Sequence, residues 1–367
     1  MKKIKILYVV STLARSGPTN QLLNIIRNLD SESFEPTVLT LSPEPSDSLK
    51  SKYDELNIRI HSLGLSRIKG LLHSKSMLTD FIKKNKPSVI HTQGIRADSL
   101  LAKLDLDIPW LLTSRNYPYD DYPMKFGRFK GGLMARSHIS AMLKCSNVVA
   151  CSKTIASELG RHKINAKPIQ NGVHTEAIDI ASDKQLGEFE SPLFVSVGSL
   201  IPRKNMAFLI EAFNHYSSEN KGSLVILGGG PEEEMLKTLA QSDRIHIKGS
   251  VSNVRDYLGI ADYFLSSSLS EGLPNTVLEG LSAGLPALLS DIPSHKEISD
   301  ESPKCAVVFE LSTGPVALSS QMSSIREVLP EQYRANAKKL ANTVFSAASM
   351  SGNYQKLYKE LVFKQHQ

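Results

Sequence analysis

The sequence predicts an α/β protein of two domains, each built on a doubly wound parallel sheet, and three observations support this prediction. The 367 residues exceed what a single hydrophobic core usually supports. In each half, short apolar runs alternate with amphipathic helical patterns, which is typical of βαβ units. A polar stretch at 175–191 separates the two halves and is interpreted as a linker.

The first half carries the βαβ pattern from its first residues. Apolar runs predict strands at 4–11, 37–41, 58–63, 89–91, 110–113, 148–150 and 168–170. Helical periodicity predicts helices at 20–29, 74–84, 97–104 and 133–143, with another between the last two strands. The opening K-K-I-K-I-L-Y-V-V is short, β-branched and without a small-residue cleavage site, so a buried strand is favoured over a signal peptide.

The segment Ser114–Gly132 interrupts this pattern, because it is aromatic, basic and broken by prolines and glycines. We expect a long loop at the carboxyl end of a strand, the side on which such sheets bind ligands. We expect Asn116, Tyr117 and Arg128 to contact a substrate there. The alternative is a loop packed on its own tyrosines.

The second half restarts the pattern after the linker. Strands are predicted at 193–197, 224–227, 245–247, 263–265, 287–290 and 306–309. Helices are predicted from Met206, at 232–240 and from Pro274, whose missing N–H suits the first helical position. The chain therefore resembles two Rossmann-like domains that face a cleft.

Composition and charge narrow the class of protein. A content of 41% hydrophobic and 22% charged residues is ordinary for a globular protein, and no apolar run reaches about 18 residues. The three cysteines lack metal spacing and suit a reducing compartment, so we expect a cytoplasmic protein. Residues 1–184 hold 27 Lys and Arg against 17 Asp and Glu, whereas the remainder holds 16 against 20. The basic half suits an anionic membrane, a phosphorylated substrate or nucleic acid, or its charge is spread over a solvated surface.

The stretch 270–286, S-E-G-L-P-N-T-V-L-E-G-L-S-A-G-L-P, carries the strongest chemical signal. Glu271 precedes the predicted helix and Glu279 lies on its first or second turn. The backbone N–H groups around Gly272, Leu273 and Asn275 would point out of the helix N-terminus, where a diphosphate is stabilised. Carboxylates beside such a site accept hydrogen bonds from sugar hydroxyls, so we expect a sugar-nucleotide site.

Glycines mark other strand ends that a doubly wound sheet brings to the same edge. Gly198, Gly228–Gly230 and Gly272 are expected to converge, with Arg203 and Lys204 placed to bind a diphosphate. Alone, such a basic pair is more often a solvated surface. In the first half, Gly17 forms a plain turn or lets the backbone approach a ligand, and the missing G-x-G-x-x-G spacing disfavours an NAD-dependent dehydrogenase.

The second half resembles the donor-binding domain of retaining nucleotide-sugar glycosyltransferases of the GT-B type, specifically the large bacterial family four. The matching pieces are N-G-V-H at 171–174, G-S-L-I-P-R-K-N at 198–205, G-G-G-P-E at 228–232, G-S-V-S-N-V at 249–254 and the two glutamates of 270–286. The resemblance implies an acceptor-binding domain of residues 1–175, a donor-binding domain of residues 176–349, and a C-terminal helix, 350–367, that crosses back to the first.

The resemblance also implies roles for individual residues. Arg203 and Lys204 would hold the donor diphosphate, Glu279 the ribose hydroxyls and Glu271 the donor hexose. Further donor contacts are implied for Gly17, Asn171, Ser199, Gly229, Val251, Gly272, Leu273, Pro274 and Asn275. No metal or other cofactor is implied, because cationic side chains and helix termini do that work.

The sequence departs from the family at two places. Ser199 stands where many members carry an arginine, a role that Arg203 is expected to take. In the first half, His91-Thr92-Gln93 stands in place of H-x-H, and Arg115 or Asn116 falls where a further histidine is usual. We expect Arg115 to act in catalysis, whereas His91 is either a site residue or a structural one.

These inferences lead to a functional hypothesis with alternatives. We expect a retaining hexosyltransferase that uses a UDP-sugar and a lipid-linked or surface-polysaccharide acceptor, as in lipopolysaccharide O-antigen synthesis. It would be peripheral on the inner face of the cytoplasmic membrane, with no nucleic-acid partner. The alternatives are a GDP-mannose-dependent or small-molecule glycosyltransferase of the same fold, and a nucleotide-sugar-binding regulatory protein without transfer activity.

Overall fold

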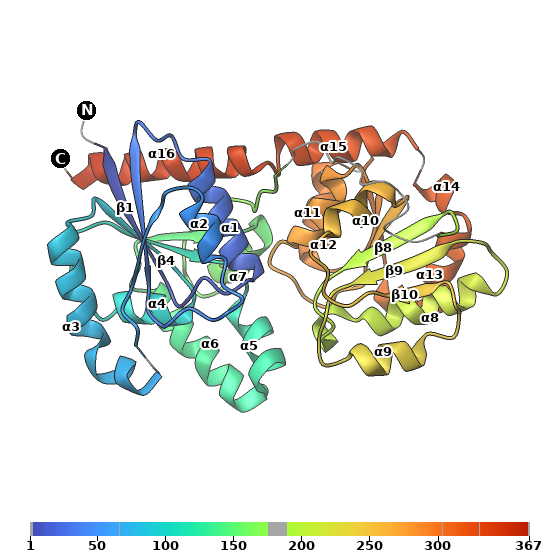
Figure 1. Cartoon of the computed structure of the whole chain (residues 1–367), viewed down its shortest axis with the longest axis horizontal. Helices are drawn as coiled ribbons and strands as arrows, with labels where there is room; N and C mark the ends of the chain where they lie inside the picture. The colour runs from blue at the N-terminus through green and yellow to red at the C-terminus, as the bar shows by residue number, and fades with distance from the viewer. Residues whose placement is uncertain (1–2, 66, 175–188, 303, 330, 366–367) are drawn as a thin grey trace. The chain divides into compact units, whose positions relative to one another are not determined.

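The computed structural model describes residues 3–65, 67–174, 189–302, 304–329 and 331–365, which form two compact units (Figure 1). The first unit contains Met1–Gly172 and Ala347–Gln367, and the second contains Val173–Ser346. Most of the predicted linker, 175–188, lies outside the described residues.

The first unit is built on a parallel sheet of seven strands in the order β3-β2-β1-β4-β5-β6-β7. The strands are β1 (Ile4–Val10), β2 (Phe34–Thr40), β3 (Arg59–Ser62), β4 (Val89–Gln93), β5 (Trp110–Ser114), β6 (Asn147–Ala150) and β7 (Ala166–Pro168). The helices are α1 (Gly17–Arg27), α2 (Lys50–Asp54), α3 (Arg67–Asn85), α4 (Ile95–Leu101), α5 (Pro118–Phe126), α6 (Arg128–Met142), α7 (Lys153–Gly160) and α16 (Ala347–Gln365).

Strand β1 shows why this sheet is covered on both faces. Successive side chains of a strand point to opposite faces. Tyr8 and its neighbours at alternate positions pack in a cluster with α1, α2 and α16, whereas Leu7 and Val9 pack with α3 and α4. The continuous apolar run of β1 therefore serves two buried faces, as expected of a parallel strand.

The C-terminal helix α16 belongs to the first unit and lies along the sheet near β1 (Figure 1). Its Tyr354 and Tyr358 are fully buried, and the hydroxyls of Tyr358 and Tyr8 are 3.2 Å apart. The prediction of a C-terminal helix that returns to the first sheet is confirmed.

The second unit is built on a parallel sheet of six strands in the order β10-β9-β8-β11-β12-β13. The strands are β8 (Leu193–Val197), β9 (Ser223–Leu227), β10 (Ile245–Ile247), β11 (Tyr263–Ser266), β12 (Ala287–Ser290) and β13 (Ala306–Phe309). The helical segments are η2 (Pro202–Lys204), α8 (Met206–Ser217), α9 (Glu233–Leu239), α10 (Val254–Ile260), α11 (Asn275–Ser282), α12 (Pro293–Glu301), η3 (Leu311–Thr313), α13 (Gly314–Ser323), α14 (Ile325–Val328) and α15 (Tyr333–Thr343). Two doubly wound α/β domains are thus confirmed.

The expectation of a long loop at Ser114–Gly132 was wrong. The segment folds into α5 and most of the first two turns of α6, separated by Gly127 at φ 81°. Pro118 occupies the start of α5, where a proline is tolerated, and buried Tyr122 anchors the helix. Pro118 marks a helix start and Gly127 a helix boundary, whereas Pro123 lies inside α5 and Gly131 and Gly132 lie inside α6. Sequence alone does not separate this pattern from a loop.

Candidate active site

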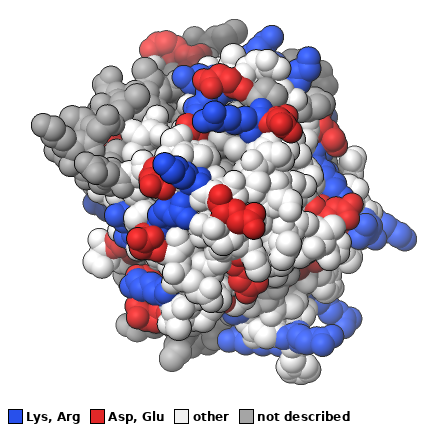
Figure 2. Space-filling model, turned by 90° about the vertical axis from the view of Figure 1, so that its right-hand side faces the viewer, with Lys and Arg blue, Asp and Glu red and all other residues white. Residues whose placement is uncertain are grey.

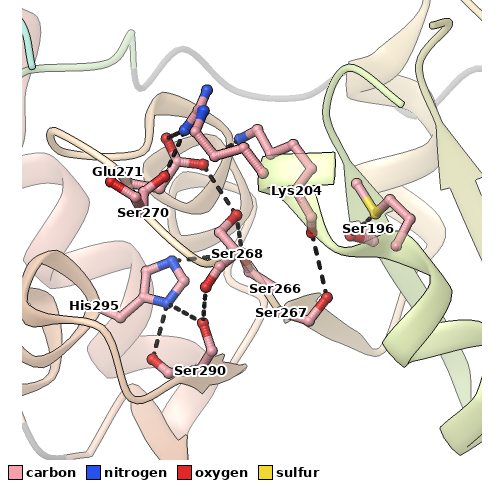
Figure 3. Close-up of polar contacts among 11 residues, drawn as sticks. Ser196, Lys204, Ser266, Ser267, Ser268, Ser270, Glu271, Ser290 and His295 are labelled. Carbon is pink, nitrogen blue, oxygen red and sulfur yellow. Dashed lines mark hydrogen bonds and ion pairs between the residues drawn. The ribbon is translucent and has the colours of Figure 1, made fainter. Parts of the chain in front are cut away.

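A half-buried ion-pair cluster lies at the carboxyl edge of the second sheet. Glu271, in the segment after β11, lies 2.7 Å from Arg203 Nη1 and 2.6 Å from Lys204 Nζ, and the two cations come from η2 after β8 (Figure 3). The side chains of Glu271, Lys204 and Arg203 are 9%, 12% and 22% exposed. We call these three residues the ion triad.

Backbone hydrogen bonds hold η2 against the segment after β11. The N–H of Leu269 donates to the carbonyl of Arg203 at 2.9 Å, and the Ser267 hydroxyl donates to the carbonyl of Asn205 at 2.7 Å. Asn205 has φ 52°, a left-handed conformation that asparagine tolerates, and it connects η2 directly to α8. The geometry of the ion triad therefore depends on two loops being locked together.

The electrostatics of the ion triad favour an anionic ligand. Burial alone would raise the pKa of Glu271, but Lys204 and Arg203 outweigh it and lower that pKa to about 2. Glu271 is therefore charged at any physiological pH and offsets one of the two neighbouring cations. The ion triad keeps a net charge of +1 at a partly exposed position, which attracts a phosphate or diphosphate.

A layer of serines and one histidine lies beneath the ion triad (Figure 3). His295, on α12, is fully buried, with its ring nitrogens 3.1 Å from the Ser290 hydroxyl and 3.4 Å from that of Ser266. The Ser268 hydroxyl donates to Glu271 Oε1 at 3.0 Å. Burial lowers the pKa of His295 to about 4, so the ring is neutral at pH 7. Sequence reasoning did not find His295, because a single histidine after a short strand carries no motif.

Glycine turns border the ion triad on the β8–β9–β10 side. Gly228 has φ 140°, and a Cβ there would lie 1.9 Å from the carbonyl oxygen of Gly198, so the two turns touch through backbone alone. The N–H of Gly228 also donates to the carbonyl of Gly249 at 2.8 Å. Ser199 follows the first turn and Gly229 lies against Ser250, which precedes Val251. The structure thus brings the predicted donor contacts Ser199, Gly229 and Val251 to neighbouring turns.

The second predicted glutamate stands on α11. This helix begins at Asn275 with Pro274 as N-cap, one residue later than predicted, while Gly272 and Leu273 lie in the turn that precedes it. Burial raises the pKa of Glu279 to about 7, opposed by Arg255 and Lys204. Arg255, on α10, is a further residue that sequence reasoning missed. Arg255 and Lys204, a member of the ion triad, thus both act electrostatically on Glu279.

A second polar cluster lies at the carboxyl edge of the first sheet. Arg115, directly after β5, donates to Gln93 Oε1 at 3.1 Å and to Asn171 Oδ1 at 2.7 Å. Among the described residues, Arg115 Nη2 and Gln93 Nε2 are buried donors without a hydrogen-bond partner. A buried donor left unpaired costs free energy, which a ligand oxygen would recover. Gln93 was not predicted as a site residue, although it ends strand β4.

The other predicted residues of the first unit are distributed differently. His91 is fully buried and bonds Tyr358 and Thr113 at 2.8 Å each, so it has a structural role. Gly17 is the first residue of α1, after the capping residue Ser16. Asn116 and Tyr117 directly follow Arg115, with the Tyr117 hydroxyl 2.8 Å from His162. Arg128 stands apart from them along the chain, exposed at the start of α6.

Within the described residues, no group of three or more His, Cys, Asp or Glu side chains is arranged to hold a metal ion. No helix that the structure describes has the length and apolarity needed to cross a membrane.

Two family models match the chain. Residues 15–177 match a model described as Glycosyltransferase Family 4, and residues 191–326 match one described as Glycosyl transferases group 1. Together the two matches cover most of both units.

Individual proteins resemble the chain over most of its length. An Escherichia coli O-antigen biosynthesis glycosyltransferase, WclY, is 25% identical over 98% of this chain and 99% of its own. An E. coli UDP-Gal:alpha-D-GlcNAc-diphosphoundecaprenol alpha-1,3-galactosyltransferase is 24% identical over 79% of this chain and 80% of its own. Among solved structures, Anabaena HepE in complex with UDP superposes with a TM-score of 0.79 at 14% identity, covering 97% of this chain and all of that one. This last likeness concerns the fold.

Proposed function

Because the chain belongs to the GT-B glycosyltransferases of family 4, we propose that it transfers a hexose or N-acetylhexosamine from a UDP-sugar to a lipid-linked or surface-polysaccharide glycan. The relatives support this acceptor class, since their names concern O-antigen biosynthesis and a diphosphoundecaprenol-linked sugar. The complex of HepE with UDP supports the donor class.

The single observation that best supports a donor site in the second unit is the ion triad. A nucleotide diphosphate brings negative charge to a position where Arg203 and Lys204 outnumber Glu271 by one charge. During transfer, negative charge accumulates on the departing diphosphate, and fixed cations stabilise that state more than the ground state. Arg203 and Lys204 thus act as leaving-group stabilisers, and Glu271 positions both of them and faces the donor hexose.

The surrounding residues supply the rest of the donor site. Glu279 accepts hydrogen bonds from the ribose hydroxyls, which would supply polar contacts that burial removes from this carboxyl group. The backbone of 272–275 meets the sugar hydroxyls or phosphates. The backbone near Ser250 and Val251 holds the base.

The proposed reaction retains the anomeric configuration. The acceptor hydroxyl attacks the anomeric carbon from the face on which the diphosphate leaves. The bond from that carbon to the diphosphate oxygen breaks, the bond to the acceptor oxygen forms, and a diphosphate oxygen takes the acceptor proton. The nucleoside diphosphate is released, and no metal ion or covalent intermediate with the protein is required.

The first unit is proposed to contribute acceptor and catalytic contacts. The unpaired donors of Arg115 and Gln93 suit a sugar hydroxyl or a phosphate oxygen, which would satisfy both groups. Arg115 is the proposed catalytic residue of this unit, with Asn116, Tyr117 and Arg128 toward the acceptor, and with Gly17 and Asn171 toward the donor.

The test is transfer from a panel of UDP-sugars to a lipid-pyrophosphate-linked sugar. We expect Lys204→Ala and Glu279→Ala each to lower kcat/KM at least about 100-fold, in the range found for electrostatic groups at active sites. Lys237→Ala is the matched control, because Lys237 also pairs with glutamates of the second unit but is 46% exposed. The Lys237→Ala variant should keep the parental kcat/KM. A Lys204→Ala variant that keeps the parental turnover would refute the assignment of the ion triad as the donor site.

Two further measurements separate the alternatives. A thermal shift with UDP and none with GDP supports the UDP-sugar donor, whereas the reverse supports GDP-mannose. A donor that binds without transfer or hydrolysis, with any acceptor, indicates a nucleotide-sugar-binding regulatory protein. Transfer to a free small molecule in place of the lipid-linked glycan indicates a small-molecule glycosyltransferase.

A further inference from the structure

The turn between α5 and α6 presents apolar and basic side chains together. All seven residues from Met124 to Lys130 are exposed, and they comprise three large apolar residues, three basic residues and Gly127. Phe129 is 83% exposed and Met124 is 54% exposed. Burying such side chains is favourable, so a run of them in water indicates a partner surface. We call residues 124–130 the hairpin tip.

The same character continues along the outer face of α6. Leu133 is 56% exposed and Arg136 is also exposed, at helical spacings that place both on the side of Phe129. From Tyr122 to Met142 the chain holds four Lys or Arg and no Asp or Glu. By contrast, the face shown in Figure 2 mixes side chains of both signs. The hairpin tip is therefore both apolar and of a single charge sign.

Buried contacts hold the hairpin rigidly, so its exposed apolar groups are a fixed feature of the fold. A Cβ on Gly131 would lie 2.3 Å from the carbonyl oxygen of Tyr122, which shows how closely α6 approaches α5. The Tyr122 hydroxyl is 2.8 Å from His138, and His138 is 2.7 Å from Asp98 on α4. All three of these side chains are buried.

The basic groups lie among the apolar ones. The ammonium groups of Lys125 and Lys130 are 5.6 and 5.7 Å from the centre of the Phe126 ring. Long basic side chains can cover apolar surface while their charged ends reach water or phosphate. This arrangement matches the boundary of a bilayer, where acyl chains lie beside anionic headgroups.

We propose that the hairpin tip docks on an anionic lipid bilayer. Phe129, Leu133 and Met124 enter the boundary between headgroups and acyl chains, and the basic side chains bind the lipid phosphates. The complementarity of charge and the apolar side chains together favour a lipid surface over a folded acidic partner. The inference deepens the proposed function and rests on it in one respect: a lipid-linked acceptor would be delivered at the surface that the hairpin binds.

The experiment measures binding of the full chain to vesicles of phosphatidylcholine, with and without 30% phosphatidylglycerol, by flotation. We expect at least about tenfold tighter binding to the anionic vesicles, since each basic residue near such a surface adds about fivefold. Phe129→Ser with Leu133→Ser should weaken that binding at least tenfold. Phe363→Ser is the matched control, because Phe363 is 65% exposed in the same unit but lies outside the hairpin.

Each outcome decides the proposal. Unchanged vesicle binding in the Phe129/Leu133 variant overturns it, as does a loss of equal size in the Phe363 control. The proposal is also overturned if the parental protein does not bind vesicles but forms a dimer through Phe129 and Leu133, as measured by sedimentation. That result would identify a second copy of the chain as the partner. Vesicle binding without transfer activity supports the docking surface while refuting the proposed function. The variant should still glycosylate a short-chain acceptor in solution while losing activity on a vesicle-bound one.

Discussion

Replacing Glu271 by glutamine tests the central physical claim about the ion triad. The carboxylate holds two half-buried cations, and its pKa falls from 4.5 to about 2. A shift of that size corresponds to about 3 kcal/mol of preference for the charged form in the folded state. Glu271→Gln removes this stabilisation and leaves Arg203 and Lys204 close together without their counter-charge. We therefore expect the free energy of unfolding of the second unit to fall by about 3 kcal/mol.

Calorimetry combined with fluorescence assigns this loss to a unit. The single tryptophan, Trp110, lies in the first unit and reports its unfolding, so the remaining calorimetric transition belongs to the second unit. For a domain of this size, 3 kcal/mol lowers the midpoint by about 6–12 °C. We expect the second-unit transition to fall by that amount at pH 7, with the fluorescence transition unchanged.

The pH dependence and a control sharpen the result. A carboxyl group with a lowered pKa stabilises the fold above its unfolded pKa, so the difference between parent and variant should shrink as pH falls from about 4.5 toward 2. Glu234→Gln is the control, because Glu234 pairs with a lysine of the same unit but is 87% exposed, and its effect should stay within about 0.5 kcal/mol. A Glu271→Gln protein as stable as the parent, or one destabilised only in the fluorescence transition, refutes the reasoning.

Three further predictions use the same two transitions. Because the pKa of Glu279 is raised from 4.5 to about 7, charging it costs stability as pH rises from about 4.5 to 7, so the free energy of unfolding of Glu279→Gln should exceed that of the parent by about 3 kcal/mol at pH 8 and by nothing at pH 4; a constant difference contradicts this. Gly228→Ala places a Cβ 1.9 Å from a backbone oxygen at φ 140° and should abolish or strongly lower the second-unit transition, whereas Gly352→Ala, with nothing within 4 Å, should be neutral or stabilising. Asp98→Ala leaves Nε2 of buried His138 without its partner and should lower the free energy of unfolding of the first unit by about 3 kcal/mol, seen as a lower midpoint of Trp110 fluorescence; an unchanged midpoint would show that the buried pair contributes nothing.

The elements of the second unit were predictable because its strands are short, apolar and bounded by glycine or polar residues. The strands at 193–197, 245–247, 287–290 and 306–309 were predicted with the observed bounds. Parallel strands buried on both faces give continuous apolar runs, which a sequence shows directly. Boundaries elsewhere moved by a few residues, and Pro274 proved to be a cap instead of the first helical residue.

The segment 114–132 was predicted less well for a physical reason. Its helices depend on contacts that are remote in sequence, above all the buried contacts of Tyr122 with His138 and of His138 with Asp98. The sequence of the segment itself does not indicate which distant residues it will contact. The same limit hid His295 and Gln93, which acquire their surroundings only when separate strands meet at one edge of a sheet.

The sequence by itself determined the class of chemistry. Glycine turns, a basic pair and two glutamates at helix and strand ends are local features that can be found without knowing how the chain packs. They predicted two parallel α/β domains, which the structure confirms, and a site for an anionic sugar nucleotide, which stays a prediction. Only the tertiary structure decided which charges touch: that Glu271 pairs with both Arg203 and Lys204, and that His91 is buried in a structural role. It also decided that the aromatic, basic segment 114–132 forms a rigid hairpin with an exposed tip. Pairing, burial and exposure are relations between distant residues, and folding alone establishes them.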